Sequence, residues 1–365
     1  MALTIDMHRS LHQIDDDAYR ALHAASAAPV FYDWRFLTAA EHSPLLPMEK
    51  VFYLTARDGN DLVGFMPAYL QRVAVVDPLG LLERTTGVRD GGGDLGLFSH
   101  IMHCWDSTVP VLPGRADALA ALLREFKQLA RREGARHAGL LSVRDPGVLE
   151  QARGQGYSAS HLVDRYDVDL RRFDDFEAFV RKLPKGGRSE MHRQLHKFEA
   201  SNATATVLAP PFDGVLDRVT ELCFRTTAKN GTPQYFPPGP LARFVRHCGT
   251  LVRLVVIECE GELAGGMICF EHAGGFHVWS AGVVYDRSSF SPYTVSVASA
   301  YRYAFARGLT RLEGGRLNER IKRRLGLTPT PLYSLIARDL LPVALDARAA
   351  LSASSAADPV RRSLH

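Results

Sequence analysis

Apolar and polar positions along the chain form one series of strands and helices in the first half and repeat it in the second. Residues 51–57 and 62–70 alternate with period two around a turn that contains Gly59, which predicts a β-hairpin. Residues 116–133 then place leucines at helical spacing, and Gly134 follows as a helix stop. The first half is therefore predicted to start its sheet with a hairpin and to cover it with a long helix.

The remaining segments of the first half are assigned by the same patterns. Helices are predicted at residues 13–27, 31–41 and 146–153, and extended segments at residues 137–143 and 157–170. Residues 77–114 are rich in glycine and proline and contain Gly91-Gly92-Gly93. A phosphate-binding loop also needs a lysine and a helix that opens directly after it, and both are missing. We expect this segment to be a flexible loop that lines a cleft.

The second half repeats the order. Residues 252–259 and 263–270 predict a second hairpin. It is followed by predicted strands at residues 276–284, 309–313 and 332–337 and by predicted helices at residues 291–307 and 318–325. Gly308 and Gly326 follow these helices at nearly the same separations from Gly134 and Gly156 of the first half. Such equal separations indicate a duplicated fold.

The duplication predicts an α+β fold, layered α/β/α, with two tandem domains. Each domain is expected to be a mixed, mostly antiparallel sheet flanked by helices. We assign residues 1–170 to a first, non-catalytic domain, residues 171–345 to a second, catalytic domain, and residues 346–365 to a disordered tail.

Composition is that of a folded globular protein, with 46% hydrophobic and 23% charged residues. The net charge of +4 is a mild bias that is compatible with a polyanionic partner. The five cysteines form no CxxC pair, which argues against a zinc site or a disulfide framework and fits a reducing cytoplasm. No apolar run reaches about 18 residues, and the N-terminus lacks the pattern of a signal peptide. We predict no metal site, no membrane span and a cytoplasmic location.

Residues 173–200, between the two copies, combine an apolar stripe with a basic face. The spacing places Arg188 and two histidines on one helix face, and Arg193 and Lys197 on a neighbouring row. A basic helix face binds phosphates by charge, although a solvated helix has the same pattern. The candidate tRNA or phosphate contacts are Lys182, Lys185, Arg188, Arg193 and Lys197.

Residues 309–326 concentrate the candidate chemistry. A strand runs into Glu313-Gly314-Gly315, and a short basic helix follows. Glycine lets the backbone come close to a ligand, and helix N-termini attract anions. The turn therefore suits a negatively charged ligand, with Arg316 and Asn318 as candidate substrate contacts. The alternative is a solvated basic helix after a Gly-Gly turn.

The order of these motifs resembles the FemABX-type aminoacyltransferases and related acyltransferases, which have the GNAT (acetyltransferase) fold, here in tandem. The matching pieces are residues 183–198, 231–236, 261–265, 279–282, 304–308 and 313–326. The family typically reads phenylalanine-lysine, two residues, phenylalanine-glycine at the last motif, where this chain has Ile321 before Lys322. The resemblance covers about residues 170–338, and the first half only through the duplication. It implies transfer of an acyl group, often an amino acid from aminoacyl-tRNA, to an amine, with Lys322 at the donor or the reacting carbonyl.

Acyl transfer to an amine needs a neutral nucleophile, a polarised carbonyl and a route for a proton. In the GNAT fold the acyl group lies along splayed central strands, so we expect residues 276–284 to hold the donor carbonyl. Lys322, Tyr285 or Tyr293 would stabilise negative charge; Glu313, His277 or Glu271 would take a proton; and Trp279, Tyr285 and Tyr235 would contact substrate. The alternatives are an ion pair of Glu313 with Arg316 or Arg320, and packing roles for His277, Tyr293 and Trp279.

The donor is predicted from a missing motif. GNAT enzymes that use coenzyme A carry a glycine-containing turn whose amides cradle the pyrophosphate at a helix N-terminus. Residues 285–293 contain no glycine, and Pro292 removes an amide donor. We therefore predict no cofactor and aminoacyl-tRNA as the donor co-substrate rather than coenzyme A. The acceptor is predicted to be an amine-bearing small molecule or peptide, such as a cell-wall precursor or a specialised metabolite. The candidate tRNA contacts Arg188, Arg193 and Lys197 are expected on one rim of the cleft between the copies.

Two alternatives remain open from the sequence. One is an N-acyltransferase that uses acyl-CoA or an acidic acyl-carrier protein, for which the basic helix would also serve. The other is a non-catalytic binder of nucleic acid or polysaccharide that keeps the fold.

Overall fold

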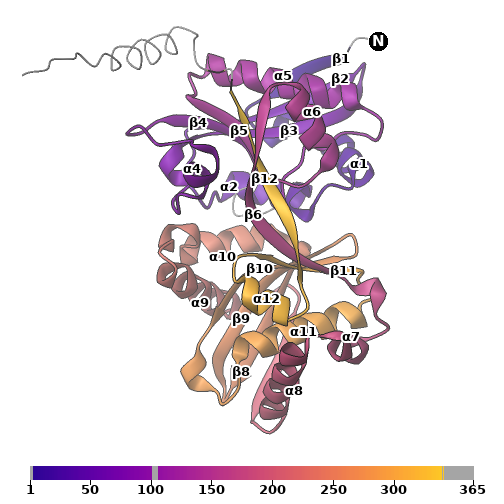
Figure 1. Ribbon diagram of the computed structural model, residues 1–365, viewed down its shortest axis with the longest axis vertical. Helices are drawn as coiled ribbons and strands as arrows, with labels where there is room; N and C mark the ends of the chain where they lie inside the picture. Colours follow the sequence, from indigo (N-terminus) through magenta and orange to yellow (C-terminus); the bar gives the residue numbers. More distant parts are fainter. Residues whose placement is uncertain (1–2, 101–105, 339, 341–365) are drawn as a thin grey trace, which may run out of the picture.

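One continuous twelve-stranded sheet runs through the computed structural model, which describes residues 3–100, 106–338 and 340. The strand order in that part of the chain is β1-β2-β3-β4-β5-β12-β6-β11-β10-β9-β8-β7. Figure 1 shows the two halves one above the other, with β6 and β12 passing between them. The tail predicted at residues 346–365 lies outside the described residues.

The first half confirms the predicted hairpin and the long helix. Its strands are β1 (Leu3–His8), β2 (Lys50–Asp58), β3 (Asp61–Arg72), β4 (Leu95–Ser99) and β5 (His137–Val143). Its helices are α1 (Asp16–Ser26), α2 (Trp34–His42), α3 (Val73–Val76), α4 (Leu81–Thr86), α5 (Ala116–Arg132) and α6 (Pro146–Gly154).

The prediction of an unstructured loop at residues 77–114 is wrong in part, because α4 and β4 lie within it. Strand β4 pairs antiparallel with β3 and parallel with β5. Five residues are too few for a clear period, and the partners on both sides supply the hydrogen bonds that fix this segment as a strand.

The second half contains α7 (Phe176–Lys182), α8 (Lys185–Glu199), β7 (Ala203–Leu208), α9 (Val215–Lys229), α10 (Pro238–His247), β8 (Val252–Cys259), β9 (Glu262–His272), β10 (Gly275–Val283), α11 (Pro292–Ala306), β11 (Arg311–Arg316) and α12 (Glu319–Arg324). The predicted second hairpin, long helix and short basic helix are confirmed. Both halves combine antiparallel strands with one parallel pair, β4–β5 in the first and β10–β11 in the second. This is the predicted mixed, mostly antiparallel sheet.

Two long strands are exchanged between the halves. Strand β12 (Thr328–Ala337) pairs with β5 of the first half, and β6 (Tyr157–Asp169) pairs with β11 of the second. The two strands also pair with each other from Thr328 opposite Asp167 to Ala337 opposite Tyr157. Each half is thus completed by a strand that follows the other half in sequence, and the sheet crosses the boundary predicted at residue 170.

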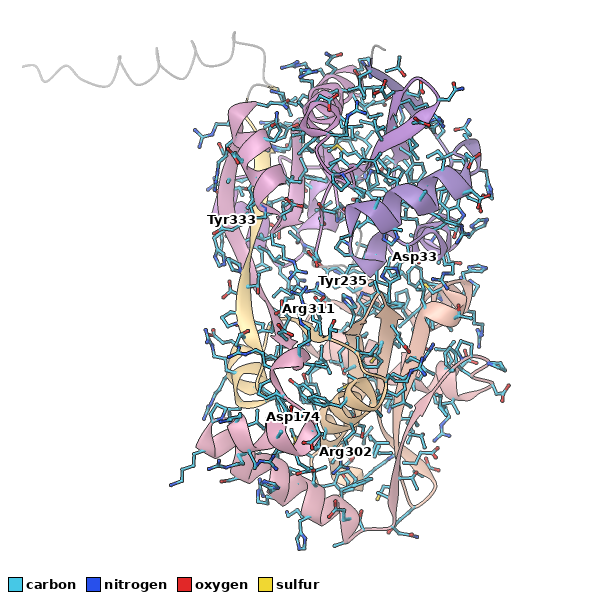
Figure 2. All side chains as sticks on the ribbon, turned by 90° about the vertical axis from the view of Figure 1, so that its right-hand side faces the viewer. Asp33, Asp174, Tyr235, Arg302, Arg311 and Tyr333 are labelled. Carbon is cyan, nitrogen blue, oxygen red and sulfur yellow. The ribbon has the colours of Figure 1, made fainter. Side chains whose placement is uncertain are left out.

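An apolar contact joins the halves beside the sheet. Phe36 of α2 lies 5.1 Å from Phe244 of α10 and 5.3 Å from Phe270 of β9, measured between ring centroids. All three side chains are at most 2% exposed. Burial of a phenylalanine contributes about 1.5–3 kcal/mol, so this contact holds the halves in one arrangement. Figure 2 shows Tyr235, Arg311 and Asp33 at the seam between them.

Candidate active site

Lys322 is a buried lysine on the short basic helix α12. β11 ends at Arg316, and Leu317 and Asn318 then adopt φ values of 62° and 54° that turn the chain into the helix. Lys322 is only 3% exposed, and its Nζ donates a hydrogen bond to the carbonyl oxygen of Arg316. The same Nζ lies 5.4 Å from the ring centroid of Tyr166. The turn thus aims the ammonium back at the end of the preceding strand.

Burial lowers the pKa of Lys322 from 10.5 to about 7, and the positive charges of Arg165 and Arg316 add to the effect. A buried ammonium loses its hydration and is repelled by neighbouring cations. Both protonation states of Lys322 are therefore accessible near neutral pH. Such a shift, in a group that a motif had already singled out, is typical of functional sites.

Replacing Lys322 by methionine is expected to stabilise the protein at pH 6. The unfolded chain keeps the lysine pKa near 10.5 and the folded chain has it near 7. Wild-type stability should therefore rise between these pH values, by up to about 1.4 kcal/mol for each unit of pKa difference. Removal of the hydrogen bond to Arg316 offsets part of the gain. We expect urea unfolding from pH 6 to pH 9.5 to show a higher free energy of unfolding for Lys322→Met than for wild type, with a difference that shrinks as pH rises. A constant difference would mean that Lys322 keeps its ordinary pKa.

The paired stretch of β10 and β11 ends close to this turn, and we call the place where the pairing ends the opening between the two strands. The two strands pair in parallel only from Gly275 to His277 on β10 and from Arg311 to Glu313 on β11. Beyond these pairs β10 continues to Val283, whereas β11 is irregular between Glu313 and Arg316. Parallel strands that separate in this way leave backbone groups without a strand partner, which are available to a ligand. That residues 276–284 hold the donor carbonyl stays a prediction.

Arg316 and Tyr235, both predicted substrate contacts, lie together at the seam. They line a cavity of about 50 Å³ with Asp77, Leu82 and other residues of the first half. Burial lowers the pKa of Arg316 to about 10, although a hydrogen bond with Tyr235 counteracts the shift. The cavity thus brings first-half residues to the strand end that Lys322 contacts.

A second cluster of charged groups is buried around Glu313. Its carboxylate pairs with Arg165 of β6, and the two side chains are 4% and 2% exposed. Arg144 lies 4.0 Å from the same carboxylate and donates from Nε to Oδ1 of Asp106 at 2.9 Å. Burial raises the pKa of Glu313, but Arg165, His277 and Arg144 outweigh it and hold the pKa well below its usual range. Glu313 therefore pairs with Arg165 of β6, a partner that the sequence analysis did not include.

His277 is held between members of this cluster. Its Nδ1 lies 3.0 Å from Nη2 of Arg165, and its Nε2 lies 3.5 Å from Oε1 of Glu313. Because arginine only donates, Nδ1 must accept, and the hydrogen is on Nε2 facing the carboxylate. Burial lowers the pKa of His277 to about 4, so the ring is neutral at pH 7. Both of its nitrogens are committed, so this arrangement favours a role in fixing Arg165 over proton transfer with a substrate.

A cavity of about 230 Å³ opens beside the cluster, between the halves. Residues 27–30 of the first half line one side, and His272, His277, Arg311 and Glu313 line the other. Figure 2 shows Arg311 at the seam.

The other predicted contacts are scattered around the second half. Trp279 packs 5.0 Å from Phe236, 5.2 Å from Phe270 and 5.6 Å from Phe244, which places it in the apolar core at the seam. Tyr285 is 59% exposed, and burial raises the pKa of Tyr293 to about 12. Asn318 is exposed on the turn before α12. The structure brings Lys322, Arg316 and Tyr235 together, and Glu313 with His277, but does not gather all nine predicted residues in one pocket.

The predicted tRNA contacts lie on α7 and α8, away from the seam. Helix α8 packs through Met191 and Leu195 into the core of the second half, and Gly187 sits so close to the carbonyl oxygen of Arg324 that a Cβ would collide with it. Arg193 pairs with Glu190 at 2.6 Å. Figure 1 shows α8 at the end of the molecule opposite the first half. These residues therefore flank α11 and α12 and do not form the predicted rim between the copies.

The N-terminus of α11 has few amides free for a pyrophosphate. The N–H of Ser291 donates to Oε1 of Gln194 on α8 at 2.6 Å, and the N–H of Thr294 donates to Oγ of Ser291 at 3.3 Å. Pro292 has no N–H. Lys197 also donates to the carbonyl oxygen of Ser289 at 3.1 Å. The basic helix thus covers the loop that would carry the pyrophosphate cradle in a GNAT enzyme that uses coenzyme A.

Arg165, Arg144, Asp106 and Tyr166 were missed by the sequence analysis. They lie in the first half or on β6 and meet Glu313 and Lys322 only because β6 crosses into the second half. No local motif marks them.

Comparisons with known proteins agree with this architecture. Residues 185–323 match the family model described as "Acetyltransferase (GNAT) domain". No curated protein matches the chain significantly. A solved structure of FemX is similar with a TM-score of 0.62 and 11% identity, over 92% of this chain and 97% of that one.

Two further solved structures cover most of both chains. L-PGS from Bacillus licheniformis has a TM-score of 0.58 and 12% identity, over 91% of this chain and 94% of that one. A tandem GNAT protein from the clavulanic acid biosynthesis pathway has a TM-score of 0.54 and 14% identity, over 93% and 99%. These similarities confirm the predicted tandem GNAT fold of the FemABX type, and the domain match bears out the prediction of an acyltransferase. In the part of the chain that the structure describes, no helix is both long and apolar enough to cross a bilayer.

Proposed function

We propose that this chain, which has a tandem GNAT fold, is an N-acyltransferase that moves an aminoacyl group from aminoacyl-tRNA to an amine acceptor. The observation that carries the proposal is Lys322, a buried lysine with a pKa lowered to about 7, beside the opening between β10 and β11. An ammonium at that place stabilises the oxyanion that forms when an amine attacks the donor carbonyl.

The reaction balances without a cofactor. The neutral amine attacks the ester carbonyl, the C–N bond forms and the bond to the ribose oxygen breaks. The departing oxygen takes up a proton, and the attacking nitrogen loses one. In the proposed mechanism Lys322 donates a hydrogen bond to the oxyanion in place of its bond to Arg316. We propose that the acceptor approaches from the first half, past Arg316 and Tyr235, which line one cavity there.

Two observations support a tRNA donor over coenzyme A. At the start of α11, the amides of Ser291 and Thr294 donate to Gln194 and Ser291, and Pro292 has no N–H. Exposed cations on α7 and α8, including Lys182 and Lys185, lie close to α12, because Gly187 of α8 meets Arg324 and Leu183 meets Gly326. Cations next to a donor site suit the phosphates of an RNA, which bind by charge and with strong salt dependence. We also propose a cytoplasmic location, which the free thiols of Cys223, Cys248, Cys259 and Cys269 support.

Incubation with charged tRNA and a panel of amines is expected to consume the aminoacyl ester and form an amide, and RNase treatment of the donor should abolish the product. Replacing Lys182 and Lys185 by alanine should raise KM for charged tRNA. The slope of log affinity against log salt concentration should also fall in magnitude, by about one for each phosphate that the variant no longer neutralises. The matched control is the pair Arg124→Ala and Arg153→Ala, two exposed cations of the first half.

Consumption of acyl-CoA or of an acylated carrier protein, with charged tRNA left intact, would contradict the proposed donor while keeping the acyltransferase. Absence of transfer from all three donors with every amine would favour the non-catalytic binder.

A further inference from the structure

We propose that His23, Asp33 and His272 form a site for a divalent transition metal ion of the zinc class at the seam between the halves. One ligand atom from each residue lies within 4.8 Å of the other two. Nε2 of His272 is 3.6 Å from Oδ2 of Asp33. Tetrahedral bonds of about 2.0–2.1 Å place ligand atoms roughly 3.3–3.5 Å apart, so small side-chain movements close the site around an ion.

The chemistry of the ligands fits such an ion. Two imidazoles and one carboxylate are the ligand set of several zinc sites with an open fourth position. Nε2 of His23 lies 3.2 Å from the carbonyl oxygen of Pro29. A neutral imidazole that donates one N–H to a carbonyl keeps a lone pair on its other nitrogen, and ligating histidines usually have such an outer contact.

Arg35 orients the carboxylate. Nε of Arg35 lies 2.9 Å from Oδ1 of Asp33, and Nη2 lies 2.9 Å from Oδ2. The backbone N–H of Arg35 also donates to Oδ1. Ligating carboxylates are commonly held by outer hydrogen bonds, which leave further lone pairs on the same oxygens. The guanidinium charge opposes a cation, so we expect weaker binding than at a site without such a neighbour.

The site joins elements of both halves. His23 is on α1, Asp33 precedes α2, and His272 ends β9. The side chains of Asp33 and His272 are 10% and 21% exposed, and His272 also lines the 230 Å³ cavity. Figure 2 shows Asp33 at the seam. A bound ion would therefore link the two halves next to the cavity that Glu313 also lines. This inference does not depend on the identity of the acyl donor.

The test uses the full chain after treatment with a chelator. Titration with Zn²⁺ alone is expected to show about one tightly bound ion per chain and a Tm that rises with the Zn²⁺ concentration. His272→Ala should abolish this binding and the Tm shift. The matched control is His42→Ala, because His12, His42 and His247 form a separate exposed group with ring centroids 5.6 and 5.8 Å apart. Loss of binding in His42→Ala but not in His272→Ala would overturn the proposal, as would no binding by wild type.

His272→Cys separates the removal of a ligand from a failure to fold. A thiolate at this position should retain the metal, and Co²⁺ should then give a sulfur-to-metal charge-transfer absorption that wild type lacks. A folded His272→Cys protein without that absorption would also overturn the proposal.

Discussion

Replacing Lys322 by methionine is expected to lower kcat for acyl transfer by about 100- to 1,000-fold, the usual cost of removing one donor to a developing oxyanion. Methionine has similar length and keeps the packing beside Tyr166, but it cannot donate a hydrogen bond. Because the interaction forms only in the transition state, kcat and kcat/KM should fall together while KM changes little. Steady-state kinetics with the donor that supports transfer measures both.

Lys127→Met is the matched control for this experiment. Lys127 is a partly buried lysine of the first half whose Nζ donates to the carbonyl oxygen of Gln155 at 2.7 Å and lies 5.5 Å from the ring centroid of Tyr157. Its surroundings therefore imitate those of Lys322 without the strand opening. Equal losses in the two variants would show that a buried lysine contact matters only for the fold, and would remove Lys322 from the mechanism.

Replacing Glu313 by glutamine is expected to destabilise the protein by about 3–5 kcal/mol, because it removes a buried carboxylate that pairs with the guanidinium of Arg165. Arg165 is only 2% exposed, so water cannot replace the missing carboxylate. Urea unfolding at pH 7 measures the change. Glu262→Gln is the control: its partner Arg287 lies 3.2 Å away, but Glu262 is 69% exposed, so the cost should be about 0–1 kcal/mol.

The pH dependence tests the same ion pair. The pKa of Glu313 is depressed in the folded protein, so its stabilisation is present above its ordinary pKa of 4.5 and is lost as pH falls towards the folded value. The difference in stability between wild type and Glu313→Gln should therefore narrow below about pH 4.5. A difference that stays constant down to pH 3 would show that Glu313 is not held as a carboxylate by its neighbours.

Much of the second half was predictable because its signals are local. The period-two alternation of residues 252–259 and 263–270 specifies strands wherever they pair, and Gly308 and Gly326 stop helices by their own conformational freedom. The motif around Lys322 was recognisable for the same reason. The strand end, the glycine turn and the helical turn that position this lysine follow one another in the sequence.

The basic face of α8 shows the limit of such patterns. Lys185, Arg193 and Lys197 of this face are exposed, but helix periodicity does not state which element covers the apolar face. The packing of Met191 and Leu195 beside α11 and α12, and not beside the first half, decided where the charge lies.

The sequence by itself determined the order of elements, the duplication and the choice of Lys322 as the first candidate, because each depends on neighbours along the chain. Only the tertiary structure decided that β6 and β12 change places, which brings Arg165 to Glu313 and near Lys322. It also decided that His23, Asp33 and His272 meet at the seam. Strand alternation fixes which face a residue occupies but not which strand lies beside it. Contacts that set the charges and pKa values of this site therefore depend on pairing between distant segments, which no local pattern records.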